Sequence, residues 1–163
     1  MDQALAIPWP AAALAVSRFG ATAATELSVV SLLDGVVGDP VTWLDQPGPA
    51  DQDGRGSAHR ARNFRSVAED IRAHLPDGAV VVHGANSSLM LIRRMLPLWR
   101  PEMVLDTLSL ARRAGLPNCD DPAIVGGTCG AAARALATAH LLLRLADALP
   151  GSGFSEGRVP YPA

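Results

Sequence analysis

The stretch that decides the fold is residues 79–115, AVVVHGANSSLMLIRRMLPLWRPEMVLDTLSLARRAG, which contains two strand–helix units in succession. The first unit is Ala79–His83, an apolar run between two glycines that predicts a strand buried on both faces, and Ser87–Leu96, which predicts a helix ended by proline. The second unit is Met103–Leu105, a short strand, and Asp106–Ala114, a helix ended by the glycine that follows. Consecutive strand–helix units favour parallel strands in one sheet.

The segment before this stretch predicts an antiparallel meander of three strands. Ala11–Ser17 is a short apolar run, and Glu26–Leu33 is rich in valine and leucine. Asp34-Gly35 is a strong hairpin signal and makes Val36–Leu44 the antiparallel partner. Because Pro40 lacks a backbone N–H, we expect this third strand to be an edge strand or to bend there.

Two more helices complete the expected order. Ala58–Leu75 carries one apolar stripe at helical spacing, and Thr128–Leu149 is long and rich in alanine and leucine. The sequence therefore predicts an α/β fold with a mixed five-stranded sheet and helices on both faces. We expect residues 1–10 to be an N-terminal lead, residues 11–149 a single domain, and residues 150–163 a flexible tail.

Composition narrows the function classes. The chain has 163 residues, of which 48% are hydrophobic, enough for one globular core. A net charge of −2 lacks the basic excess of a dedicated nucleic-acid binder. All fourteen basic residues are arginine, which we interpret as the signature of a high-GC bacterial genome. The sequence has no CxxC motif, no membrane-spanning run and no basic leader, so we expect a cytoplasmic protein with free thiols.

The stretch 79–115 resembles the DnaQ-like 3′–5′ exonucleases, the DEDDh family of the ribonuclease-H-like superfamily. In that family a strand is followed by A-H-N-A-x-F-D-x-x-F-L-R-R-x-L and then by D-T-L-x-L-A-R-R. Residues 83–96 lie over the first motif without a gap, and Asp106–Arg113 match the second almost letter for letter. Weaker matches in the hairpin and the last helix extend the resemblance to residues 11–149.

The resemblance implies a ribonuclease-H-like fold, and it also shows where this chain departs from the family. DnaQ-like enzymes hold two divalent ions with four carboxylates and use a histidine as general base. On this sequence the four acidic positions fall on Ala15, Ser17, Ser88 and Arg134, and the histidine position falls on Cys129. None of these residues supplies a carboxylate or an imidazole. The resemblance therefore implies a catalytically degenerate homologue with no metal site and no cofactor, and we do not expect an active nuclease.

Three functions stay open for such a homologue. The first is a non-catalytic module that binds a protein partner or itself. The second is weak residual binding of single-stranded nucleic acid or a nucleotide, and the third is metal-free enzyme chemistry on a small anionic substrate. The candidate ligand-binding residues are Ser17, His83, Ser88, Cys129 and Arg134. The Arg134 guanidinium would repel a metal and is able to hold a phosphate or carboxylate bidentately.

Structural explanations compete with these hypotheses. We interpret His83 mainly as a strand-end histidine with a satisfied hydrogen bond, and Asp106 as a structural part of its motif. Cys129 lies in a small-x-Cys-x-small pattern like a nucleophile elbow, but no convincing strand precedes it, so a catalytic thiol is the lesser alternative. The arginines between Arg55 and Arg72 are interspersed with Asp51, Asp53, Glu69 and Asp70, which favours a solvated surface over a polyanion site.

Overall fold

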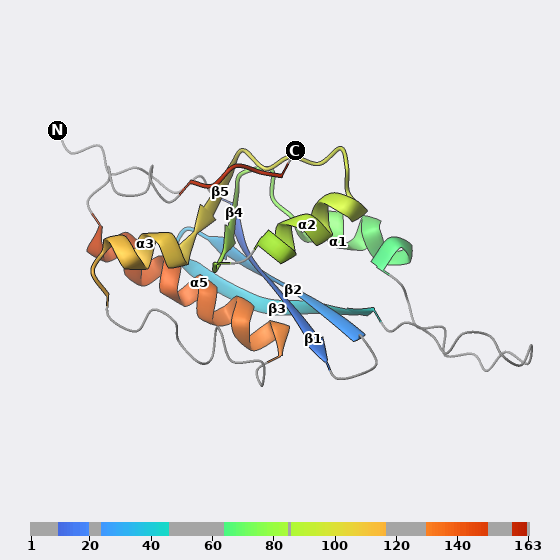
Figure 1. Ribbon diagram of the computed structural model, residues 1–163, viewed down its shortest axis with the longest axis horizontal. Helices are drawn as coiled ribbons and strands as arrows, with labels where there is room; N and C mark the ends of the chain where they lie inside the picture. The colour runs from blue at the N-terminus through green and yellow to red at the C-terminus, as the bar shows by residue number, and fades with distance from the viewer. Residues whose placement is uncertain are drawn as a thin grey trace, which may run out of the picture.

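The computed structural model describes residues 10–19, 24–45, 64–84, 86–116, 130–149 and 158–162. Within them the chain forms a five-stranded mixed β-sheet with four α-helices (Figure 1). The elements are β1 (Ala11–Phe19), β2 (Ala24–Leu33), β3 (Val36–Asp45), the 3-10 turn η1 (Phe64–Val67), α1 (Ala68–His74), β4 (Ala79–Val82), α2 (Asn86–Met95), β5 (Met103–Asp106), α3 (Thr107–Arg113) and α5 (Ala131–Ala148). The α/β class and the mixed five-stranded sheet expected from the sequence are confirmed.

The sheet has the strand order β3-β2-β1-β4-β5, so β1 is its central strand. The pairs β1–β2 and β2–β3 are antiparallel, whereas β1–β4 and β4–β5 are parallel. Pro40 lies in the edge strand β3 opposite Val30, next to a register shift between Val30 and Leu32. The strand is thus both at an edge and irregular near the proline, as the missing N–H predicts.

The β2–β3 hairpin closes on two residues in the left-handed backbone region. Asp34 has φ of 50° and Gly35 has φ of 81°. A type I′ turn requires positive φ at both central residues, and aspartate followed by glycine tolerates this best. This short turn fixes the register of the meander.

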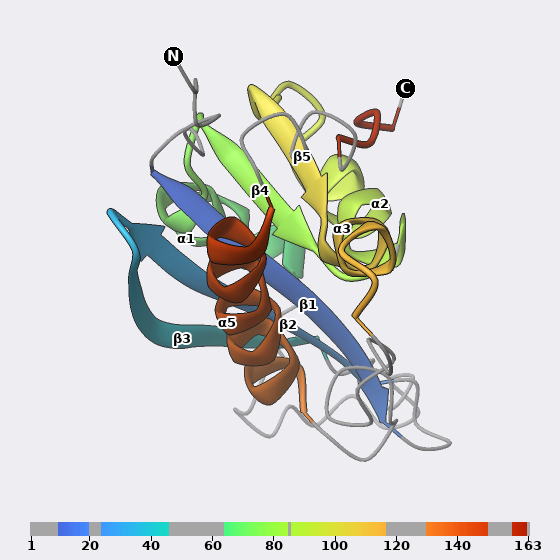
Figure 2. The same ribbon diagram turned by 90° about the vertical axis from the view of Figure 1, so that its left-hand side faces the viewer.

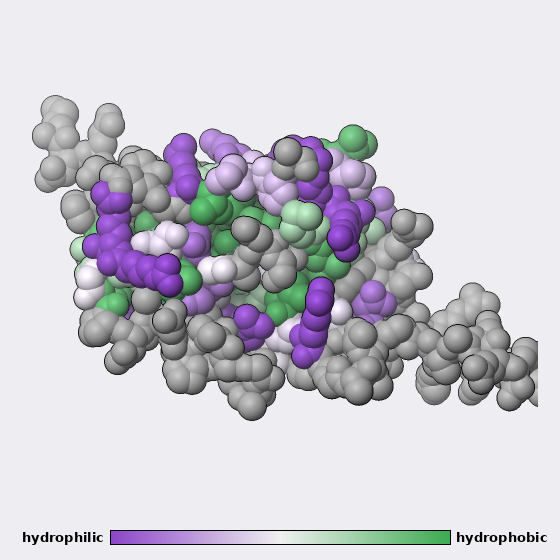
Figure 3. All heavy atoms as spheres, viewed as in Figure 1, coloured by the Kyte–Doolittle hydropathy of each residue, from purple (hydrophilic) through white to green (hydrophobic). Residues whose placement is uncertain are grey.

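Helices cover both faces of the sheet, because the side chains of β1 alternate between two apolar clusters. Ala11, Ala13 and Ala15 join the cluster that contains α3 and α5. Ala12 and Leu14 join the cluster that contains α1 and α2. Figure 2 shows α5 lying across one face of the sheet. In the view of Figure 3, hydrophobic side chains are visible between the helices and hydrophilic side chains surround them.

The helix expected over Ala58–Leu75 is shorter in the residues that the structure describes. Residues 58–63 lie outside them, and the remainder begins with the 3-10 turn η1 before α1. The Nε1 of Trp43 donates a 2.7 Å hydrogen bond to Asp70 Oδ2, and its ring meets His74 edge-on at 5.3 Å. These contacts hold α1 against the edge strand β3. None of the helices in the described part of the chain has the length and apolar run needed to cross a bilayer.

Residues 158–162, which belong to the tail expected over residues 150–163, contact the sheet in the structure. Arg158 forms an isolated antiparallel bridge with Leu105, and the backbone N–H of Val159 donates to the Val104 carbonyl at 3.0 Å. Val159 and Tyr161 pack against the cluster that contains α1 and α2. The two apolar residues of this segment thus lie against the core beside the outer edge of β5.

Candidate functional site

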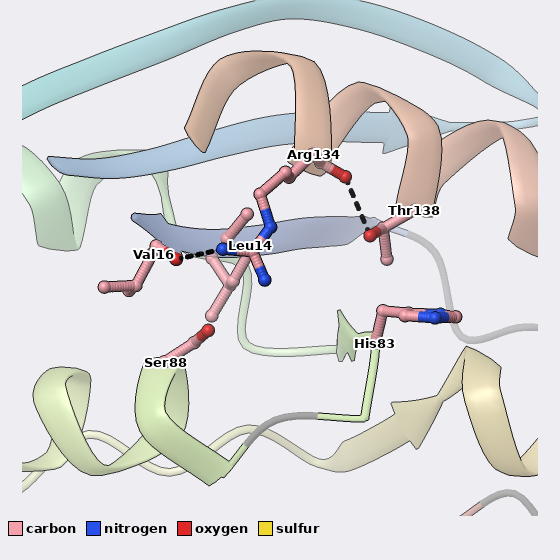
Figure 4. A pocket seen from close by; sticks show the side chains of 7 residues that line it. Leu14, Val16, His83, Ser88, Arg134 and Thr138 are labelled. Carbon is pink, nitrogen blue, oxygen red and sulfur yellow. Dashed lines mark hydrogen bonds between the residues drawn. The ribbon is translucent and has the colours of Figure 1, made fainter. Parts of the chain in front are cut away.

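A small pocket lies where β4 ends beside the longer strand β1. The pairing of β4 with β1 covers only Ala11–Ala13 of β1, which continues to Phe19. Carboxyl ends of parallel strands are where α/β sheets bind ligands, so this end of the sheet is the natural place for a site. The pocket has a volume of about 10 Å³ and is lined by Leu14, Ala15, Val16, His83, Ser88, Arg134 and Thr138 (Figure 4). That volume is close to the space of one water molecule.

Arg134 reaches into this pocket from the first turns of α5. Its Nη1 donates a 2.7 Å hydrogen bond to the carbonyl oxygen of Val16 and approaches Ser17 Oγ at 3.4 Å. The side chain is half-buried and points to the central strand, as Figure 4 shows. The guanidinium therefore holds a fixed positive charge against the carboxyl-terminal half of β1.

The structure brings together four of the residues selected from the sequence. Ala15 and Ser88 line the pocket with Arg134, and Ser17 contacts the Arg134 guanidinium. Ala15, Ser17 and Ser88 are all buried. These residues come from β1, α2 and α5, which are far apart in the sequence. Their polar groups are two hydroxyls and one guanidinium, a set that can hold carbonyl oxygens or anions.

His83 lines the same pocket, but its Nδ1 is engaged elsewhere. Nδ1 lies 2.8 Å from Thr107 Oγ1, and that hydroxyl donates to the Val82 carbonyl at 3.1 Å. The hydroxyl has one proton, which the carbonyl accepts, so Nδ1 must carry a proton and donate it to Thr107. Figure 4 shows the imidazole directed away from Ser88. This geometry agrees with a strand-end histidine whose orientation and Nδ1 proton are fixed by Thr107.

Asp106 is occupied by structural hydrogen bonds. Its Oδ1 accepts from the backbone N–H of Gly84 at 2.7 Å and of Leu108 at 3.1 Å. Its Oδ2 accepts from Ser109 Oγ at 2.6 Å. The carboxylate thereby caps α3 and ties it to the loop after β4. Gly84 has φ of +63°, a backbone conformation that favours glycine, and a Cβ there would lie 2.6 Å from Leu108 Cδ2.

The sequence reasoning did not identify Glu26 as a neighbour of the site. Its Oε2 accepts a 3.0 Å hydrogen bond from the backbone N–H of Ala131, the first residue of α5. The residue before the helix is Gly130, which has no side chain to act as a cap. A helix that begins Gly-Ala-Ala-Ala has no side chain nearby that can cap its first N–H groups. The absence of a local cap is the only feature of the sequence that indicates a cap from a distant residue.

Thr138 was also missed, although it lines the pocket. Its hydroxyl donates to the Arg134 carbonyl one turn earlier, at 2.8 Å. The hydroxyl is thus engaged within the helix and turns a methyl group to its surroundings. Cys129 lies outside the described residues, so the structure does not address a Cys129–His83 pair.

The residues around the pocket do not fit a pair of divalent ions. Hard ions such as Mg²⁺ need oxygen ligands, preferably carboxylates, and the side chains that line this pocket are apolar groups, hydroxyls, one imidazole and one guanidinium, with no carboxylate among them. Within the described residues, no group of three or more His, Cys, Asp or Glu side chains lies close enough to hold a metal. Neither a scan of protein-family models nor a search of curated proteins finds a match to this chain.

Proposed function

We propose that this chain is a catalytically inactive domain of the DnaQ-like exonuclease type, with a ribonuclease-H-like fold, that serves as a binding or interaction module. Support for the fold type comes from the antiparallel meander β1–β3 followed by the parallel strands β4 and β5. The alignment behind the proposal is supported by the convergence of Ala15, Ser17, Ser88 and Arg134 on one end of the sheet. A wrong alignment would scatter these four positions.

The observation that carries the proposal is the hydrogen bond from Arg134 to Val16. In the resemblance, the position of Arg134 is that of a metal-binding aspartate. Here the same position carries a guanidinium, which stays protonated. This cation is hydrogen-bonded to β1, the strand that would carry two more metal ligands in the resemblance. A charge of this sign, held by the backbone, disfavours divalent ions at the place where nuclease chemistry needs them.

The two other hypotheses receive less support. Ligand pockets usually have volumes of about 300–1,000 Å³, whereas this pocket has about 10 Å³. A nucleotide or a small anionic substrate therefore does not fit beside Ser88 and Arg134 in this arrangement. Nη1 of Arg134 is committed to protein oxygens, which favours a structural role for that side chain over bidentate anion binding.

A nuclease assay on the unmodified chain tests the proposal directly. A single-stranded oligonucleotide labelled at its 5′ end is incubated with the protein and Mg²⁺ or Mn²⁺, and its shortening is followed on a gel. We expect no metal-dependent shortening above that of a buffer control. Clear turnover that depends on the metal and co-purifies with the chain would overturn the proposal.

Restoring the carboxylates tests the alignment itself. The quadruple variant Ala15→Asp, Ser17→Glu, Ser88→Asp and Arg134→Asp is compared with a matched amide variant, Ala15→Asn, Ser17→Gln, Ser88→Asn and Arg134→Asn. We expect saturable Mn²⁺ binding by electron paramagnetic resonance, and a rise in melting temperature with Mn²⁺, for the carboxylate variant alone. A folded carboxylate variant that binds Mn²⁺ no better than the amide variant would argue against the alignment.

A further inference from the structure

Residues 158–162 lie beside the free edge of the sheet and are joined to it by one isolated bridge. β5 is the last strand in the order, so its outer backbone groups have no neighbour from β1–β4. The Val159 N–H donates to Val104 of β5 at 3.0 Å, and Arg158 is bridged to Leu105. One backbone hydrogen bond and one bridge are the beginning of strand addition, a binding mode in which main-chain hydrogen bonds supply affinity and alternate side chains supply specificity.

The side chains of this segment alternate as a bound strand requires. Arg158 and Pro160 are exposed, whereas Val159 and Tyr161 are half-buried against the cluster behind β5. Pro160 has no N–H, but in a strand whose Val159 N–H points to β5 the next N–H points away. The proline therefore loses no hydrogen bond to β5 and prevents a further strand from pairing on the outside.

The surface that contacts residues 158–162 includes Arg93, Trp99 and Arg100. Trp99 meets the Tyr161 ring edge-on at 5.9 Å, and the Arg100 guanidinium lies 5.1 Å from the centre of that ring. Arg100 is held in this position by hydrogen bonds to the carbonyls of Pro97 and Trp99 at 3.0 and 3.1 Å. Arg93 of α2 donates to the Pro162 carbonyl. An aromatic side chain is thus recognised by a tryptophan edge and a cation.

The segment lies at the surface and is open to competition. No residue of 158–162 is fully buried. The hydroxyl of Tyr161 is enclosed without a hydrogen-bond partner in the described residues, and such a group weakens docking. A second segment with the same pattern can therefore replace the first when its concentration is high enough.

We propose that the β5 edge, together with Arg93, Trp99 and Arg100, is a peptide-docking site for an extended segment of the pattern Val-Pro-Tyr-Pro carried by another polypeptide. The chain's own residues 158–162 fill the site in cis and act as a built-in competitor. The docking site depends on these contacts alone. It is therefore independent of the proposal that the domain is catalytically inactive, which depends on Arg134, and either proposal can fail without the other.

The test uses the full chain with Val159→Pro, which removes the N–H that bonds to Val104 and releases the tail. The probe is a fluorescein-labelled peptide with the sequence of residues 154–163, FSEGRVPYPA, and binding is followed by fluorescence anisotropy. A tethered segment competes at an effective concentration on the order of millimolar, so we expect the variant to bind the probe at least about tenfold more tightly than the unmodified chain. Arg158→Ala is the matched control, because its side chain is exposed, and it should bind like the unmodified chain.

Two further measurements separate specific docking from non-specific adhesion. A probe with proline at the Val159 position should lose binding to the Val159→Pro chain. Adding Arg100→Gln to that chain should lower its affinity for the unmodified probe by about two- to fivefold, because the cation above the tyrosine ring is lost. A Val159→Pro chain with an unchanged circular dichroism spectrum that does not bind the probe, or that binds the proline probe equally well, would refute the docking site.

Discussion

The guanidinium of Arg134 donates a 2.7 Å hydrogen bond to the carbonyl oxygen of Val16, joining the last helix to the first strand across 118 positions of the chain. The carbonyl belongs to the part of β1 that extends past its pairing with β4. Arg134 therefore gives a donor to a backbone group that lies beyond the reach of β4.

Replacing Arg134 by methionine should destabilise the protein by about 1–3 kcal/mol, because the carbonyl of Val16 loses a charged donor in a half-buried place. Methionine keeps most of the hydrocarbon stem and the helix propensity. Arg144→Met on the exposed side of the same helix is the control, with an expected change within about 0.5 kcal/mol. Urea denaturation measures both, and equal effects would contradict a structural role for Arg134.

Thr107→Val should cost about 1–3 kcal/mol in the free energy of unfolding, since it leaves Val82 and His83 without the hydroxyl they share. Thr107→Ser keeps the hydroxyl and should recover most of the loss. Nitrogen-15 chemical shifts of His83 in the unmodified protein should report a proton on Nδ1. A ring protonated at Nε2 alone would contradict the hydrogen-bond assignment.

Asp106→Ala should lower the free energy of unfolding by about 2 kcal/mol, because α3 loses its cap and Gly84 loses its acceptor. Asp106→Asn retains an Oδ1 acceptor and is a good capping residue, so it should cost less than half as much. Thermal melts followed by circular dichroism compare the two variants. An asparagine variant as unstable as the alanine variant would show that the negative charge, rather than the acceptor, matters.

Tyr161 gives the docking of the tail a pH dependence. Burial raises the pKa of its phenol above the ordinary value of 10.0, and the nearby Arg100 and Arg93 offset only part of that rise. The docked state thus binds the proton more tightly than the released state, so docking is constant below about pH 10 and weakens as the pH rises above it.

The chain has a single tyrosine, so the absorbance of the phenolate follows Tyr161 alone. We expect the midpoint of this titration to fall towards the ordinary pKa of tyrosine in the Val159→Pro chain, where the tail is released. Tyr161→Phe should make docking independent of pH in this range. An identical midpoint in the docked and released chains would contradict the burial of the phenol.

Local patterns were enough to predict most of the fold. The apolar run before Gly84, the Asp34-Gly35 turn and the Pro40 edge signal each depend on neighbouring residues, and each appears in the structure where the pattern indicated. The strongest motif, Asp106–Arg113, is explained by caps and hydrogen bonds around the β4–β5 junction. These residues therefore have a structural role at that junction, whatever chemistry the motif suggests.

Long-range pairs could not be predicted in the same way. The contact between Glu26 and Ala131 depends on how β2 lies against α5, and no local pattern encodes it. Residues 158–162 have the composition of a tail, and only the unpaired edge of β5 gives them a place to bind. The alignment brought Ser17, Ser88 and Arg134 together as candidates, but the direction of the Arg134 guanidinium follows from packing alone.

The cap that Glu26 provides for α5 has a consequence for how the chain folds. Glu26 and Ala131, the first residue of α5, are 105 positions apart, and the helix has no capping side chain of its own at Gly130. The first turn of α5 gains its cap only after the chain has closed a loop of that length. Closing so long a loop costs conformational entropy and is therefore slow. We therefore expect the amino-terminal turn of α5 to be among the last parts of the domain to become protected against amide hydrogen exchange during refolding, well after the β2–β3 hairpin.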